Sequence, residues 1–261
     1  MIIDSHQHVI VPTEKQLALM SEAGIDKTIL FSTSVHPETT NDLESFEKEM
    51  EALNGIVSGK QNAIESKIKS IEELAGVIEK NPTKFMGFGS VPLGLSQDAT
   101  SSWIEDKVIR NKFLGLGEFT LAPGQVQLLK PIFSAAKDFN NLPLWIHTFS
   151  PLAIDDIKAI SLLAKQFPEV PVILGHLGGA NWLETIKLAK ESKNLFLDLS
   201  ATFSTLVVSL AIKTLPERTL FSSDAPYGNP LICRETIESV TNDSHVKDQV
   251  LGLNIAELLD L

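Results

Sequence analysis

The chain has 261 residues, a net charge of −11 and 43% hydrophobic residues, which is ordinary composition for one large domain or two smaller ones. The acidic balance argues against nucleic-acid binding, and no apolar run approaches the ~18 residues that a bilayer span needs. The first residues lack the basic segment of a secretory signal, and a single cysteine cannot form an internal disulfide. We therefore expect a cytoplasmic protein without nucleic-acid or membrane partners.

Eight short apolar runs, rich in β-branched residues, predict strands along the chain. They lie at 1–6, 27–33, 85–91, 113–119, 142–147, 171–176, 195–200 and 219–224. Between them, apolar residues recur at three- and four-residue spacing, as in helices that cover a sheet. Eight strand–helix units in ~250 residues predict a single (β/α)8 TIM-type barrel over 1–261. A doubly wound open sheet is the alternative, but no glycine-rich phosphate loop supports it.

The segment at 38–82 is longer than one crossover helix requires. Its periodicity predicts two acidic helices, at roughly 41–54 and 61–80, between the second and third strands. We interpret them as a helical excursion from the barrel whose charges mostly face solvent.

Polar side chains collect where the predicted strands end. His6 and His8 are two residues apart, so on a strand they point to the same face. The full set is His6, His8, Glu118, His147, His176 and Asp224. In a barrel, the carboxyl ends of all strands meet at one mouth. Burying these groups without partners costs several kcal/mol, and a divalent cation supplies the partner. Imidazole and carboxylate ligands suit Zn²⁺ first, with Mn²⁺, Fe²⁺ or Co²⁺ possible.

These residues resemble the amidohydrolase superfamily. The resemblance covers the whole chain and rests on "DSHQH" at 4–8, the two later strand-end histidines, "HLGG" at 176–179 and "FSSDAP" at 221–226. The last two motifs are most similar to the amidohydrolase-related branch, with its dihydroorotase-like hydrolases and some metal-dependent decarboxylases. The resemblance implies a distorted barrel with one or two divalent metals, and metal roles for His6, His8, His147, His176 and Asp224.

Glu118 departs from the branch, where many two-metal members carry a carboxylated lysine on the fourth strand. A glutamate there is similar to TatD-type nucleases, and we expect it to bridge two ions. We expect hydrolysis of a small amide, cyclic amide, lactone or ester by a metal-bound hydroxide, with Asp224 transferring the proton. With one metal, His176 would instead orient the water or polarise the scissile group. Decarboxylation of an aromatic or unsaturated acid, phosphodiester hydrolysis and metal storage are the alternatives.

Further residues are candidates for supporting roles. Asp198 either orients a metal-bound imidazole or makes a structural hydrogen bond. Cys233 is either a reactive thiol or a small buried hydrophobe. Arg234 either binds a substrate carboxylate or forms a surface ion pair. The candidate substrate contacts are His36, Phe149, Asn181, Trp182, Tyr227 and Arg234. The substrate itself is not predicted, and a homodimer is an expectation from the fold class alone.

Overall fold

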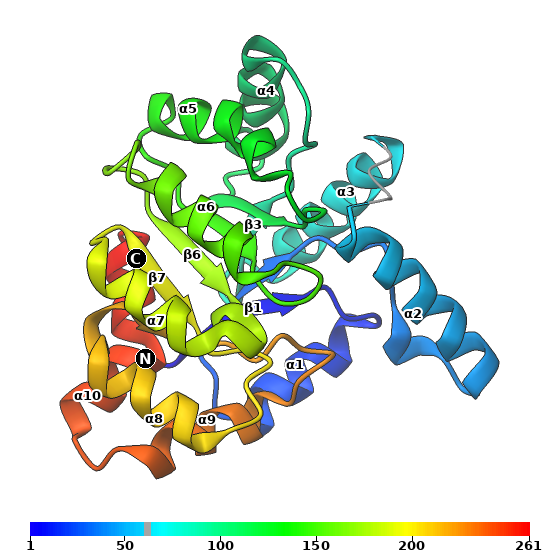
Figure 1. Ribbon diagram of the computed structural model, residues 1–261. Coiled ribbons are helices and arrows are strands. Elements are labelled where there is room, and N and C mark those ends of the chain that lie inside the picture. Colours follow the sequence, from blue (N-terminus) through cyan, green and yellow to red (C-terminus); the bar gives the residue numbers. More distant parts are fainter. Residues whose placement is uncertain (60–63) are drawn as a thin grey trace.

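The computed structural model describes residues 1–59 and 64–261, and its centre is one parallel eight-stranded sheet (Figure 1). The strands are paired in chain order from β1 to β8. They are β1 (Ile3–His8), β2 (Lys27–Phe31), β3 (Phe85–Gly89), β4 (Gly115–Phe119), β5 (Leu144–His147), β6 (Val172–Gly175), β7 (Leu195–Asp198) and β8 (Thr219–Leu220). The predicted (β/α)8 barrel is confirmed.

Backbone hydrogen bonds join the first strand to the last and bring the sheet round into a barrel. Ser5 donates its N–H to the carbonyl of Phe221 at 3.0 Å, and His8 donates to Ala225 at 2.8 Å. The amide of Asp224 donates to the carbonyl of His6, also at 2.8 Å. The histidines of β1 and the aspartate after β8 are therefore placed side by side by the closure itself.

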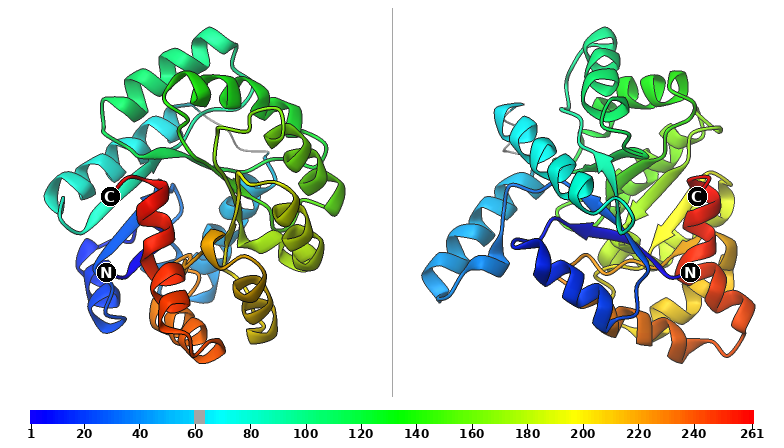
Figure 2. Two further views of the ribbon diagram at one scale, coloured as in Figure 1. Left: turned by 90° about the vertical axis from the view of Figure 1, so that its left-hand side faces the viewer. Right: turned by 180° about the vertical axis from the view of Figure 1, so that it is seen from behind.

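Most helices cover the outside of the barrel (Figures 1 and 2). They are α1 (Thr13–Glu22), α4 (Gln97–Trp103), α5 (Lys130–Asp138), α6 (Ile154–Ala164), α7 (Trp182–Glu191), α8 (Thr205–Thr214), α9 (Pro230–Val240), α10 (Ser244–Asp248) and α11 (Asn254–Leu258). In α6, Ile157, Ile160 and Ala164 recur at helical spacing and are fully buried. The main apolar core lies between such helix faces and the strands.

A second apolar cluster fills the inside of the barrel. Phe31, Phe88 and Trp145 pack there in tilted and edge-to-face contacts with ring centroids 5.2 to 5.9 Å apart. Ile255 of α11 belongs to the same cluster, so the C-terminal helix packs against the barrel interior. The interior is thus a packed core, which leaves the strand ends as the place for chemistry.

The predicted excursion consists of α2 (Leu43–Val57) and α3 (Ile64–Lys80). Asp42 caps α2 by accepting the amide of Ser45. Helix α3 buries Ile71 and Leu74 completely, whereas α2 buries none of its residues. Helix α2 projects away from the barrel in Figure 1 and again from behind in Figure 2. The predicted start of the second helix, at 61–63, lies outside the described residues.

The described part of the chain contains no helix with both the length and the hydropathy that crossing a bilayer requires.

Candidate active site

Six strand-end side chains from five segments of the barrel converge at its mouth. His6 and His8 come from β1 and Glu118 from β4, His147 ends β5, and His176 directly follows β6. The sixth is Asp224, after β8. Two sets of these residues have potential ligand atoms that all lie within 4.8 Å of one another. One set is His6, His8 and Asp224, and the other is Glu118, His147 and His176. A further set joins Asp198 to His6 and His176.

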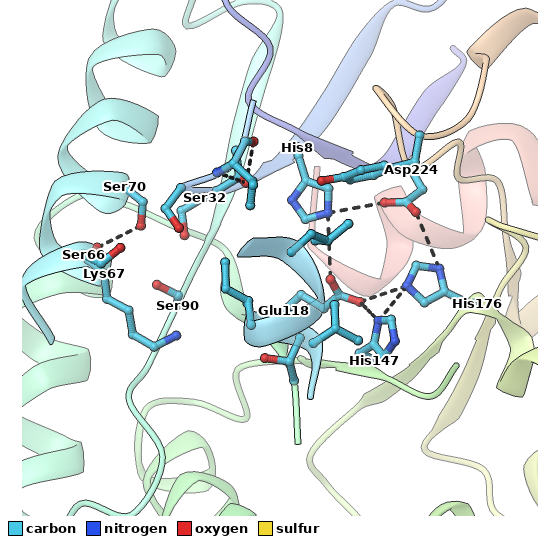
Figure 3. A pocket seen from close by; sticks show the side chains of 18 residues that line it. His8, Ser32, Ser66, Lys67, Ser70, Ser90, Glu118, His147, His176 and Asp224 are labelled. Carbon is cyan, nitrogen blue, oxygen red and sulfur yellow. Dashed lines mark hydrogen bonds and ion pairs between the residues drawn. The ribbon is translucent and has the colours of Figure 1, made fainter. Parts of the chain in front are cut away.

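Glu118 lies between the two halves of this cluster (Figure 3). Its Oε1 atom is 3.1 Å from both His147 Nδ1 and His176 Nε2. Its Oε2 atom faces the other half, 3.9 Å from His6 Nε2 and 3.8 Å from His8 Nε2. One carboxylate therefore offers one oxygen to each half.

Three of the imidazoles have the ring nitrogen remote from the cluster engaged as a donor. His6 Nδ1 lies 3.0 Å from Asp198 Oδ2, and His147 Nε2 lies 3.1 Å from the carbonyl of Ser150. His176 Nδ1 lies 2.8 Å from Ser200 Oγ, whose own proton goes to Asp198. Because these partners accept, the opposite nitrogen of each ring points toward the cluster, with a lone pair when the ring is neutral and a proton when the ring is charged.

Asp198 supports the cluster from beneath without lining the cavity. Its Oδ2 atom accepts hydrogen bonds from His6 Nδ1, the indole of Trp145, the amide of His176 and the hydroxyl of Ser200, at 2.9 to 3.2 Å. Both predicted alternatives for Asp198 therefore hold geometrically, since it makes structural hydrogen bonds and also orients an imidazole.

Glu118 and His176 stabilise each other's charged forms. Burial alone would raise the pKa of Glu118, but hydrogen bonds from His147 and His176 lower it well below its ordinary value. Burial would lower the pKa of His176, yet Glu118, Asp224 and Asp198 together raise it to about 10. The surrounding carboxylates thus favour a positive charge on the His176 ring.

The residues present fit a divalent cation. His6 Nε2 is buried, has no hydrogen-bond partner among the described residues, and faces the two cluster carboxylates. His147 Nδ1 and His176 Nε2 are 3.0 Å apart, so two lone pairs oppose each other unless a proton or a cation lies between them. Imidazole nitrogen and carboxylate oxygen are suitable donors for Zn²⁺ and Mn²⁺.

Local backbone geometry directs these side chains inward. Gly117 has a φ of +142°, and a Cβ there would lie 2.6 Å from the carbonyl oxygen of Trp145, so glycine is required before Glu118. His176 and Asp224 adopt φ values of 59° and 58°, which non-glycine residues rarely do. Such strained conformations concentrate at functional sites.

A cavity of about 210 Å³ opens directly above the cluster. Its floor includes His8, Glu118, His147, His176 and Asp224. An apolar wall comes from the segment after β2 and from helix α2, and hydroxyl groups line the remainder. The apolar wall consists of Val35, Leu53, Ile56 and Val57, and the hydroxyl groups belong to Ser32, Thr33, Ser34, Ser66, Ser70, Ser90 and Thr120.

A family model described as Amidohydrolase matches residues 3–261. The chain belongs to the amidohydrolase family. No curated protein matches this sequence. The predicted resemblance is confirmed at the level of the family, whose members carry out more than one kind of reaction.

Solved structures share the fold of this amidohydrolase at low identity. A 2,6-dihydroxybenzoate decarboxylase from Rhizobium is 17% identical, with a TM-score of 0.69 over 99% of this chain and 98% of the other. A dihydroxybenzoic acid decarboxylase from Polaromonas, with bound manganese and 2-nitroresorcinol, is 18% identical, with a TM-score of 0.72 over 100% and 97%. A 4-oxalomesaconate hydratase from Rhodopseudomonas palustris is 18% identical, with a TM-score of 0.68 over 100% and 96%.

The six predicted substrate contacts are distributed unevenly around this site. Tyr227 lines the cavity, with its ring 5.9 Å from that of His8. Trp182 lines a small separate cavity of about 10 Å³ beside His176. His36 lies outside both cavities and pairs with Glu38 at 3.2 Å.

The other three predicted contacts, Phe149, Asn181 and Arg234, do not line the main cavity. Phe149 packs under Gly179, where an added Cβ would overlap its ring. The carbonyl of Asn181 accepts the hydroxyl of Thr185 within the turn that starts α7. On α9, Arg234 donates to the carbonyl of Ala23 and pairs with Glu238 at 2.9 Å. The ion-pair alternative for Arg234 therefore describes its position, and we do not propose it as a substrate contact.

Most of the cavity wall was not predicted from the sequence, and its unpredicted polar residues include Lys67 and Ser90. Lys67 precedes Ile71 and Leu74 by four and seven residues, which places a lysine on the buried face of α3. A lysine among apolar residues on one helix face was the sequence signal that could have identified Lys67. Ser90 follows β3 directly, at the barrel mouth.

Cys233 of α9 is partly buried and its thiol is expected to be unreactive. Burial, with a contribution from buried carboxylates including Asp4 and Asp198, raises its pKa to about 12. At pH 8 roughly one molecule in ten thousand would carry the nucleophilic thiolate, against about a quarter for an ordinary cysteine. Ellman's reagent at pH 8 should label the denatured chain within minutes and leave the native protein unlabelled. Rapid native labelling would restore the reactive-thiol alternative.

Proposed function

We propose that this amidohydrolase is a divalent-metal-dependent decarboxylase of a small aromatic or unsaturated acid. The observation that carries the proposal is that an apolar wall faces the buried cluster of histidines and carboxylates across the main cavity. Such a wall suits a flat hydrocarbon body, while a cation in the cluster attracts the acid group. Two of the structural neighbours named above are decarboxylases of aromatic acids.

His6, His8 and Asp224 would hold the cation. His6 Nε2 and His8 Nε2 lie 3.7 and 3.3 Å from Asp224 Oδ1, so the three donor atoms face a common point. Zn²⁺ or Mn²⁺ bound there would polarise an oxygen of the substrate and stabilise negative charge that develops during the reaction. Asp198 fixes the His6 ring for this role through its hydrogen bond to Nδ1.

Glu118, His147 and His176 would then hold the proton that is transferred to the substrate. If one cation is held by His6, His8 and Asp224, no cation separates the remaining three side chains. Their contacts of 3.0 to 3.1 Å then require a shared proton, which we assign to His176 Nε2. In decarboxylation the bond between the carboxyl carbon and the substrate breaks, and carbon dioxide leaves. The electron pair stays on the substrate carbon, which takes the proton from His176.

Hydrolysis of an amide, lactone or ester is a second candidate, because Glu118 presents one oxygen to each half of the cluster. This geometry suits two cations bridged by one carboxylate. The first would again be held by His6, His8 and Asp224, and the second by His147 and His176. In that reaction Asp224 would accept a proton from the attacking water and return it to the leaving group.

One experiment separates the two reactions. Protein loaded with Zn²⁺ or Mn²⁺ is assayed against aromatic and unsaturated acids, against amides, lactones and esters, and against a model phosphodiester, with bound metal counted for each preparation. Release of carbon dioxide that stops on chelation and returns with metal, at one equivalent per chain, is the expected result. Turnover of only carbonyl substrates, at two equivalents, would replace decarboxylation with hydrolysis. Phosphodiester cleavage alone would overturn both.

A further inference from the structure

Lys67 is a cation in the cavity wall that the proposed chemistry does not use. It lies on α3 and is half-buried, and its side chain points into the cavity that contains Glu118 and His176 (Figure 3). Among the described residues, no carboxylate forms an ion pair with its amino group within 4.0 Å. Burial lowers the pKa of Lys67, and no neighbouring charge offsets that effect. A partly desolvated ammonium without a partner is costly, and an anionic ligand would supply one.

Ser90 provides a second unsatisfied group at the same end of the cavity. Its residue is 6% exposed, and its hydroxyl oxygen is buried without a hydrogen-bond partner among the described residues. Its backbone carbonyl is already occupied by the indole of Trp103 at 3.0 Å, which fixes the residue in place. Buried hydroxyl groups normally find partners, so an unpartnered one that lines a cavity indicates a ligand atom.

Polar groups lie at both ends of the cavity. In Figure 3, Lys67 and Ser90 lie on one side with Ser66 and Ser70, whereas the buried histidines and carboxylates lie on the other. The apolar wall from Val35 and α2 runs along the same cavity. A ligand that fills it would present one polar group to each end and hydrocarbon between them.

We infer that Lys67 and Ser90 form a subsite for a second carboxylate, and that the substrate is therefore a small aromatic or unsaturated diacid. This inference rests on the proposed function, since it assigns the first carboxylate to the cation site. Among the described residues 1–59 and 64–261, Lys67 is the one lysine or arginine in the lining of this cavity, and a single ammonium neutralises a single negative charge. That match favours a carboxylate over a doubly charged phosphate.

Binding of inert probe pairs tests the subsite without requiring turnover. The Kd of metal-loaded protein is measured by calorimetry for benzoate against isophthalate and terephthalate, for crotonate against fumarate, and for benzoate against phenyl phosphate. We expect the diacid of at least one pair to bind about tenfold or more tightly than its monoacid, as a charge-assisted hydrogen bond in a shielded site provides. Equal affinities within every pair would overturn the subsite, and so would a preference for phenyl phosphate over every diacid.

Substitutions assign the effect to the two residues. Lys67→Met should remove the diacid preference, whereas Lys69→Met, at an exposed position of the same helix, should retain it. Ser90→Ala should weaken diacid binding several-fold without lowering Tm, because its hydroxyl makes no hydrogen bond in the free protein. A drop in Tm with unchanged diacid affinity would show a structural role for Ser90 and contradict the inference.

The outcomes also separate this inference from the proposed function. A diacid preference that depends on Lys67, in a protein that releases no carbon dioxide from any acid, would keep the subsite and refute decarboxylation. Release of carbon dioxide from monoacids, with no diacid preference and no effect of Lys67→Met, would keep decarboxylation and refute the subsite.

Discussion

Replacing His8 with asparagine is expected to abolish both metal binding and turnover. His8 Nε2 is 3.3 Å from Asp224 Oδ1 and 3.8 Å from Glu118 Oε2, so its loss removes one of three donors around the proposed cation. Changes to outer partners of a metal ligand already cost about 10- to 100-fold in affinity, and loss of the ligand itself should cost at least about a hundredfold. Metal analysis after dialysis should find the variant essentially metal-free and inactive.

The position suits the experiment because His8 is less buried than His6, so the variant should fold. Its side chain is 14% exposed, against 0% for His6. His245→Asn, at an exposed position on α10, is the matched control and should retain metal and activity. A folded H8N variant with a full metal complement would remove His8 from the ligand set.

Replacing His176 with glutamine is expected to separate metal binding from proton transfer. If one cation is held by His6, His8 and Asp224, the variant should keep one equivalent of metal. Its release of carbon dioxide should fall by about 10²- to 10⁴-fold, which is the usual contribution of a general acid. Exchange of the product's ring or vinyl hydrogen in D₂O, followed by NMR, should fall with it, because that exchange is the reverse of the same proton transfer.

The same variant also tests the hydrolytic alternative. In a two-cation site His176 is a ligand of the second ion, so H176Q should lose one of two equivalents of metal. Unchanged metal content with unchanged hydrogen exchange would exclude His176 from both roles.

The barrel was predictable because its signals are local and repeated. Each strand is a short apolar run, and all eight observed strands begin and end within a few residues of the predicted runs. Their carboxyl ends meet at one mouth, so residues as far apart as His6 and Asp224 could be brought together from strand order alone. The excursion was also predictable, with α2 and α3 over 43–57 and 64–80.

The cavity walls were not predictable in the same way. Which side chains reach a cavity depends on how loops and the excursion pack, and no periodic pattern encodes that packing. Phe149 and Arg234 occupy sequence positions similar to that of Tyr227, just after strands or on the last helices, yet they are engaged elsewhere. Ser90 carried no signal at all, because an unsatisfied hydroxyl is recognised only once its surroundings are known.

The polar cluster and part of the cavity wall come from different segments of the chain. The histidines and carboxylates of the cluster come from strand ends. Leu53 and Ile56 come from α2, which buries none of its residues, whereas Lys67 comes from α3, which packs Ile71 and Leu74 into the core. Residues of α2 can therefore change with little effect on the packing of the barrel. Exchange of this one helix between relatives should alter ligand preference while the strand-end cluster stays in place.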